Sequence, residues 1–94
     1  MQEILKAIWE KIQTTPFSYQ TCLDLYGMSK EAMKEDATRE MGVNYLKKLS
    51  AFCERTIRDG QLSNEELREL FALHKRVCLG LAPHDFDNYL LYME

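Results

Sequence analysis

Apolar residues recur every three to four positions along almost the whole chain, and no segment shows the strict alternation of a half-buried strand. This spacing places apolar side chains on one face of an α-helix. Four glycines each follow such a segment, where a residue in the left-handed conformation commonly ends a helix. They are Gly27, Gly42, Gly60 and Gly80. The sequence therefore predicts an all-α fold, a compact bundle of five or six short helices over residues 2–13, 16–26, 29–41, 43–59, 63–79 and 85–93.

Residues that cap helix N-termini precede several of these segments. Thr15 stands before a proline, Ser29 opens the third segment, and Ser63 with Glu66 forms a capping box in which each side chain satisfies a free backbone N–H. These residues predict where the helices begin.

Gly42 is the weakest of the four stops, because apolar spacing continues through it. We favour a break there, although an interior glycine costs only about 1 kcal/mol and one helix over residues 29–59 is the alternative.

With 94 residues, the chain predicts one helical domain over residues 1–94 with a single hydrophobic core. Three helical faces supply that core. The expected core residues are Ile4, Leu5, Ile8, Trp9, Ile12, Leu46, Leu49, Phe52, Cys53, Ile57, Leu67, Leu70, Phe71, Val77, Cys78 and Leu81.

The net charge of −3 argues mildly against a nucleic-acid binder, since phosphate contacts usually require a basic balance. No signal-peptide pattern or apolar run of membrane-spanning length occurs, so we expect no membrane association. The three cysteines, Cys22, Cys53 and Cys78, are far apart within apolar helical sequence. They are expected to be reduced core residues of a cytoplasmic protein.

Residues 22–41, CLDLYGMSKEAMKEDATREM, locally resemble the helix-turn-helix of bacterial repressors and sigma-factor-like regulators. The resemblance implies a DNA-reading helix over residues 29–41, which Ser29 caps and Met41 closes, with Lys30, Lys34 and Arg39 contacting DNA. Acidic residues alternate with these basic ones, and carboxylates are repelled by phosphates. DNA binding is therefore the alternative function, and a solvated helix is the favoured reading.

No pattern for catalysis, metal or cofactor binding stands out. Residues 59–67 resemble half of an EF-hand loop, but Arg55 and Ile57 occupy ligand positions, so calcium is not expected. His74 and Cys78 are spaced for two metal ligands, which is too few for a site, and His74 is expected at the core edge with one hydrogen bond. His84 is expected to be exposed. We expect no enzyme, no metal and no cofactor.

The C-terminal residues 83–94, PHDFDNYLLYME, are apolar on more than one side. Aromatic residues and methionine are favoured at interface cores, although internal packing explains them equally well. The favoured function is a small non-catalytic protein-interaction module (an adaptor, inhibitor, immunity or regulatory factor) that self-associates, with a homodimer or another protein as partner. The expected contact residues are Trp9, Phe86, Tyr89 and Tyr92.

Overall fold

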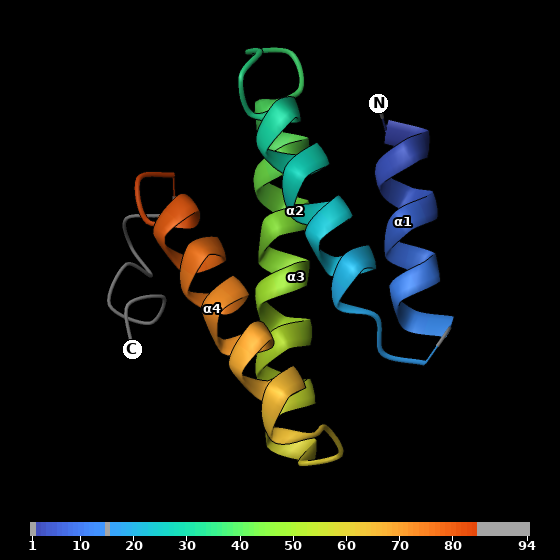
Figure 1. Ribbon diagram of the computed structural model, residues 1–94. Coiled ribbons are helices and arrows are strands. Elements are labelled where there is room, and N and C mark those ends of the chain that lie inside the picture. Colours follow the sequence, from blue (N-terminus) through green and yellow to red (C-terminus); the bar gives the residue numbers. More distant parts are fainter. Residues whose placement is uncertain (1, 15, 85–94) are drawn as a thin grey trace. The chain divides into compact units, whose positions relative to one another are not determined.

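The computed structural model describes residues 2–14 and 16–84, which form four helices and no strand (Figure 1). The helices are α1 (Gln2–Thr14), α2 (Tyr19–Ala32), α3 (Arg39–Asp59) and α4 (Asn64–Leu81). The all-α prediction is confirmed. Over the described residues the helices number four rather than five or six, because the segments expected around residue 29 do not exist as separate helices. The helix expected over residues 85–93 lies outside the described part of the chain.

The chain divides into two compact units, Met1–Leu46 and Lys47–Glu94, with the boundary inside α3. The first unit contains α1, α2 and the first part of α3. The second contains the rest of α3 and α4. Each unit is described by itself below.

In the first unit, α1 and α2 pack side by side (Figure 1). Leu5 and Ile12 form the buried face of α1, whereas Ile4, expected in the core, is 50% exposed. The helix α2 begins at Tyr19 rather than at residue 16. Its N-cap is Ser18, whose Oγ accepts a hydrogen bond of 3.3 Å from the backbone N–H of Thr21. A serine in this role satisfies a donor that would otherwise lack a partner.

The prediction that Gly27 ends a helix and Ser29 caps the next one is wrong. The helix α2 continues through both residues to Ala32. Gly27 is exposed with no neighbouring atom near its absent side chain, while Ser29 is fully buried inside the helix. An interior glycine is tolerated at a cost of about 1 kcal/mol. Ser29 is therefore a small residue in a packed position, and not a cap.

The break predicted at Gly42 is also wrong, as is the alternative of one helix over residues 29–59. Gly42 lies buried in the first turn of α3. A Cβ at Gly42 would lie 2.6 Å from the carbonyl oxygen of Ser29 and 2.7 Å from Cγ of Met33. Those distances are well below van der Waals contact, so the glycine permits close approach of α3 to the end of α2.

The chain changes direction instead between residues 33 and 38. Thr38 Oγ1 donates a hydrogen bond of 2.6 Å to the carbonyl of Ala32, and Arg39 Nε donates one of 3.2 Å to the carbonyl of Met33. Carbonyls in the last turn of a helix lack intrahelical partners. Two side chains from beyond the turn thus satisfy the end of α2.

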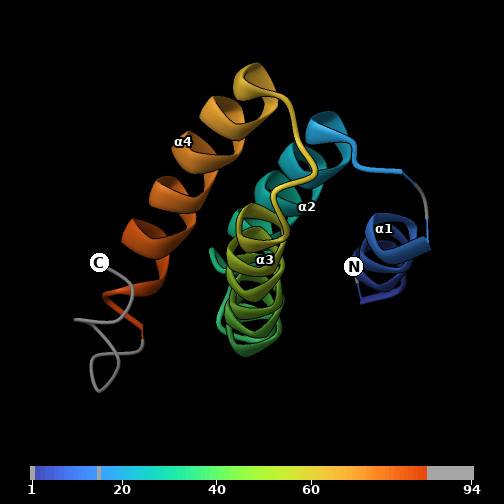
Figure 2. The ribbon, with the colours of Figure 1, turned by 90° about the horizontal axis from the view of Figure 1, so that it is seen from below.

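In the second unit, a short connection joins α3 to α4 (Figure 2). Gly60 has a φ of +67°, which side chains other than glycine rarely adopt, and ends α3 as predicted. The capping box of Ser63 and Glu66 is present in both directions, with hydrogen bonds of 3.2 and 3.1 Å. Local signals alone therefore account for this connection.

The buried side chains of the second unit come from one face of each helix. Leu49 and Cys53 on α3 and Leu70, Leu73, Val77 and Leu81 on α4 are fully buried. Phe71, which was expected in the core, is 55% exposed. The core prediction is wrong for that residue.

Candidate functional site

The structure describes one of the four residues expected to contact a partner. Trp9 is half-buried on α1. Phe86, Tyr89 and Tyr92 lie outside the described residues. The expected contact surface therefore stays a prediction.

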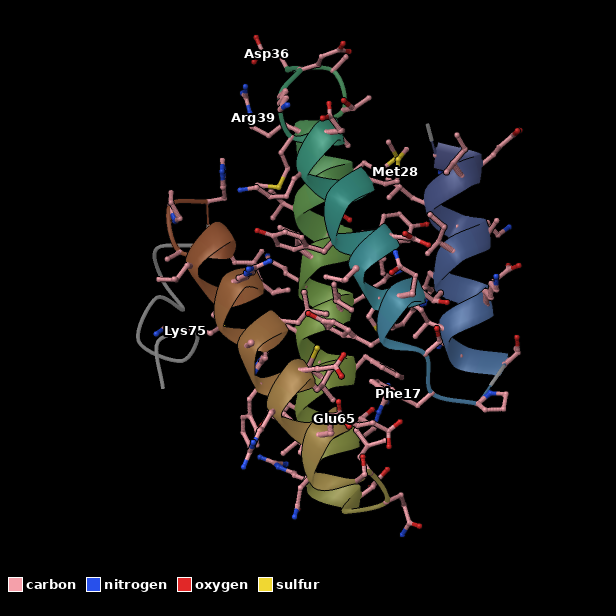
Figure 3. All side chains as sticks on the ribbon, in the orientation of Figure 1. Phe17, Met28, Asp36, Arg39, Glu65 and Lys75 are labelled. Carbon is pink, nitrogen blue, oxygen red and sulfur yellow. The ribbon has the colours of Figure 1, made fainter. Side chains whose placement is uncertain are left out.

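The helix over residues 29–41, on which the DNA-binding alternative depended, does not form. Its residues are divided between the end of α2, the turn and the start of α3. Lys34 pairs with Glu31 at 3.0 Å and Arg39 with Asp36 at 2.7 Å. Figure 3 shows Asp36 and Arg39 together at this turn. The carboxylates beside these cations oppose the positive charge that a phosphate contact needs.

A polar cluster lies within the second unit, between α3 and α4. Ser50 Oγ and His74 Nε2 are 3.1 Å apart, and Ser50 also hydrogen-bonds the thiol of Cys78. Ser50 and Cys78 are buried, and His74 is half-buried. The expected position of His74, at the core edge with a hydrogen-bond partner, is confirmed. His84 is exposed, also as expected.

Burial is the largest influence on the pKa values of both titratable groups in this cluster. Burial raises the pKa of the Cys78 thiol; the hydrogen bond from Ser50 lowers it in part and the Glu54 carboxylate raises it. Burial lowers the pKa of His74 from its usual 6.5, and Glu54 offsets only part of that shift. A reactive cysteine needs a lowered pKa, since the thiolate is the nucleophile. Within the second unit, this cluster links α3 to α4 through the Ser50 hydroxyl.

Over the described ranges, no group of three or more His, Cys, Asp or Glu side chains is arranged to hold a metal ion. His74 and Cys78 thus gain no third ligand among those residues. Cys22, Cys53 and Cys78 are buried thiols, as expected.

The outward side of α4 carries an unusual combination of side chains. Between residues 68 and 79, six positions of this helix are exposed. We call them the outer face of α4; they are Arg68, Phe71, Ala72, Lys75, Arg76 and Leu79. Three are basic and none is acidic, in a chain whose net charge is −3. Figure 3 shows Lys75 projecting outward from α4.

Two large apolar side chains accompany these cations. Phe71 is 55% exposed and Leu79 is 48% exposed. Along a helix, residues 71, 75 and 79 follow one another at intervals of four, so the two apolar groups flank Lys75 on one side of the helix. The outer face of α4 therefore joins apolar surface to positive charge.

The sequence analysis missed this face because it assigned Phe71 to the core. A helical projection contains the missing signal. Leu70, Leu73, Val77 and Leu81 already define one complete apolar face. Phe71 and Leu79 stand beside Lys75, outside that face, and their exposure follows from this position.

No protein-family model, curated protein or solved structure matches this chain. Among the residues that the structure describes, no helix is both long enough and apolar enough to span a bilayer.

Proposed function

We propose that this protein is a small non-catalytic protein-interaction module that self-associates, of the adaptor, inhibitor, immunity or regulatory class. We assign its contact surface to the outer face of α4. The observation that carries this proposal is the exposure of Phe71 and Leu79 among three basic residues.

The apolar side chains supply a driving force for association. Fully burying a leucine or phenylalanine is worth about 1.5–3 kcal/mol relative to leaving it in water. A half-exposed side chain has roughly half of that still to gain. Phe71 and Leu79 together therefore offer on the order of 1.5–3 kcal/mol to a partner that covers both.

The basic side chains define the chemistry of the partner. Complementary charge mainly sets specificity and association rate. Arg68, Lys75 and Arg76 favour an acidic surface that also carries apolar groups. A uniformly basic surface would be repelled.

A single exposed apolar residue is common on monomeric proteins and needs no partner to explain it. Ile4 on α1 is such a residue, at 50% exposure. The outer face of α4 differs because it has two exposed apolar residues on the same side of one helix. The charged residues of this face are all basic. Ile4 is therefore a matched control for this surface.

The non-catalytic part of the proposal is supported by the cluster at Ser50. The pKa of His74 is lowered, which disfavours its charged form, and the pKa of Cys78 is raised, which disfavours the thiolate. Neither group has the shifted pKa expected of an activated nucleophile.

Sedimentation velocity over a wide range of protein concentration tests the proposal. We expect the wild-type chain to associate, and the double substitution Phe71→Glu with Leu79→Glu to weaken that association. Ile4→Glu introduces one such charge at a similarly exposed position and should leave association unchanged. A sedimentation coefficient of the monomer at every concentration would contradict self-association.

A titration of labelled random-sequence duplex DNA at low and physiological salt checks the alternative function. We expect no binding at either salt. Micromolar binding that weakens steeply with salt would indicate phosphate contact through counterion release, and would refute the assignment as a purely protein-binding surface.

A further inference from the structure

The charge of the outer face of α4 restricts how two copies of the chain can meet. Its charged residues are Arg68, Lys75 and Arg76, and all are basic. When a surface pairs with its own copy across a twofold axis, the same residues approach from both sides. Three cations would then face three cations, and like charges placed together oppose binding. A second copy is therefore expected to present a different, acidic surface to this face.

Acidic charge is concentrated in one segment of the first unit. Residues 1–46 contain seven acidic and five basic residues, whereas residues 47–84 contain five acidic and seven basic ones. Four of those seven acidic residues lie between residues 31 and 40 with two basic ones, and the other charges of the first unit balance at three of each sign. We call the exposed charged residues of this segment the acidic turn; they are Glu31, Lys34, Glu35, Asp36, Arg39 and Glu40. Two ion pairs within it leave Glu35 and Glu40 as the source of its net negative charge.

The bend that carries these residues is held by its own hydrogen bonds. Arg39 pairs with Asp36 and also donates to the carbonyl of Met33. The Asp36 side chain is 92% exposed and that of Arg39 only 44%, so a partner meets the carboxylate more readily than the guanidinium (Figure 3). Thr38 secures the same bend through the carbonyl of Ala32. A surface that is ordered before binding loses less conformational entropy on association.

The acidic turn also offers apolar area. Ala37 is exposed within it, and Met41, which follows it directly, is half-buried. Phe71 and Leu79 on the outer face of α4 have apolar area to bury. The two surfaces are thus opposite in charge, and each has apolar groups beside its charges.

We infer that the outer face of α4 of one molecule binds the acidic turn of a second copy of the same chain. This inference rests on the proposed function, because it takes self-association through the outer face of α4 as given and names the surface on the other side. Since the two surfaces differ, the contact is either made twice in a reciprocal pair or repeated from copy to copy.

Charge reversal on each side tests the contact by sedimentation velocity at low salt. Lys75→Glu with Arg76→Glu should weaken self-association by about tenfold or more, and so should Glu31→Lys with Glu35→Lys, because each places like charges together. An equal mixture of the two variants should associate as the wild-type chain does. In that mixture the reversed face meets the reversed turn, and the native face meets the native turn.

Two controls accompany these variants. Glu3→Lys with Glu10→Lys reverses the same amount of charge at exposed positions of α1 and should leave association unchanged. Circular dichroism should show the wild-type helix content in every variant, since all the substituted side chains are exposed.

The outcomes separate this inference from the proposed function. Wild-type association of Glu31→Lys with Glu35→Lys would overturn the inference, and a loss confined to Lys75→Glu with Arg76→Glu would retain the outer face of α4 as a contact surface. A mixture that stays as weakly associated as its components would also overturn the inference. A wild-type chain that is monomeric at every concentration would remove the proposed self-association, and the inference with it.

Carbodiimide cross-linking locates the contact directly, because the reagent joins a lysine amine to a neighbouring carboxylate as an amide with loss of water. An equal mixture of nitrogen-15-labelled and unlabelled protein distinguishes links between two molecules from links within one. We expect mixed-isotope peptides that join Lys75 to residues 31–40. Links of Lys75 that are confined to single molecules, or that lead only to carboxylates outside the acidic turn, would overturn the inference.

Discussion

The connection from α3 to α4 is closed by contacts among its own residues, whereas the connection from α2 to α3 depends on residues distant along the chain. In the first case, Gly60 has the left-handed backbone and Ser63 and Glu66 cap each other. In the second, Gly42 lies nine and thirteen positions from the residues that approach its α-carbon, Met33 and Ser29. The same residue types, glycine and serine, thus perform different tasks at the two places.

The difference teaches what a glycine or a serine signifies. At Gly60 the requirement is conformational, because the backbone has a φ of +67°. At Gly42 the requirement is steric, because a neighbouring helix fills the space of a side chain. Only the first kind of requirement is visible in a local stretch of sequence.

Gly42→Ala should lower the free energy of unfolding more than any other substitution proposed here. A smaller effect would contradict the steric role assigned to Gly42. The added methyl group would meet a backbone oxygen at 2.6 Å, which cannot move away without shifting α2. Overpacking of this kind costs about 1–3 kcal/mol, which urea unfolding measures. Gly27→Ala is the control: its Cβ meets nothing within 4 Å, so it should stabilise the protein by about 0.5–1 kcal/mol. Two alanine variants with the same sign of effect would refute the steric explanation.

Gly60→Ala should have the next largest effect. An alanine in the left-handed region costs about 1–2 kcal/mol, although open space surrounds its Cβ. Gly60→Asn should recover part of the loss, since asparagine tolerates this conformation better. Equal unfolding midpoints for all three proteins would show that the backbone at this turn relaxes without strain.

Ser63→Ala should lower the free energy of unfolding by about 1 kcal/mol, because the N–H of Glu66 loses its acceptor. Ser63→Asp preserves an acceptor at this position and should retain most of the stability. Chemical denaturation of the three proteins, monitored by circular dichroism, makes the comparison. If Ser63→Asp were as unstable as Ser63→Ala, the cap would not be the cause.

The smallest expected effect concerns pH and the hydrogen bond between Ser50 and His74. Burial lowers the pKa of His74 in the folded state below its usual 6.5, so the unfolded chain binds a proton first as pH falls. The stability that the protein gains from burying neutral His74 is fully present above about pH 6.5. It is lost as the pH falls below that value toward the pKa of His74 in the folded state. Unfolding free energies measured from pH 7.5 to 5 should therefore decline.

His74→Gln should flatten that decline, whereas His84→Gln, at an exposed histidine, should leave it unchanged. A decline of equal slope in the wild-type chain and in His74→Gln would exclude His74 as its source.

The sequence predicted the helical class, the ends of α1, the stop at Gly60 and the capping box at Ser63, since these depend on residues close together in the chain. It misplaced the start of α2, which begins at Tyr19 after the N-cap Ser18. It misread Ser29 and Gly42, whose small size serves packing between helices. No local pattern separates the two uses of a small residue.

On α4, the sequence predicted the position of His74 at the core edge but assigned Phe71, which belongs to the outer face, to the core. Periodicity identifies apolar residues near one helical face, yet it does not decide where that face ends. Phe71 directly follows Leu70 in the sequence, so its side chain points in a different direction around the α4 axis. Leu70 is fully buried, whereas Phe71 is 55% exposed. The boundary of the face was the missing information.

The three buried thiols can serve as built-in reporters of local unfolding. Cys22 belongs to the first unit, and Cys53 and Cys78 belong to the second. Burial raises the pKa of Cys22 to about 11, so neither access nor thiolate is available to an alkylating reagent while its helix stays packed. Alkylation at each thiol, timed by mass spectrometry, therefore counts openings of its own unit. If the two units open at different rates, the alkylation rates of the native cysteines will differ between the units, and no added label is needed to measure them.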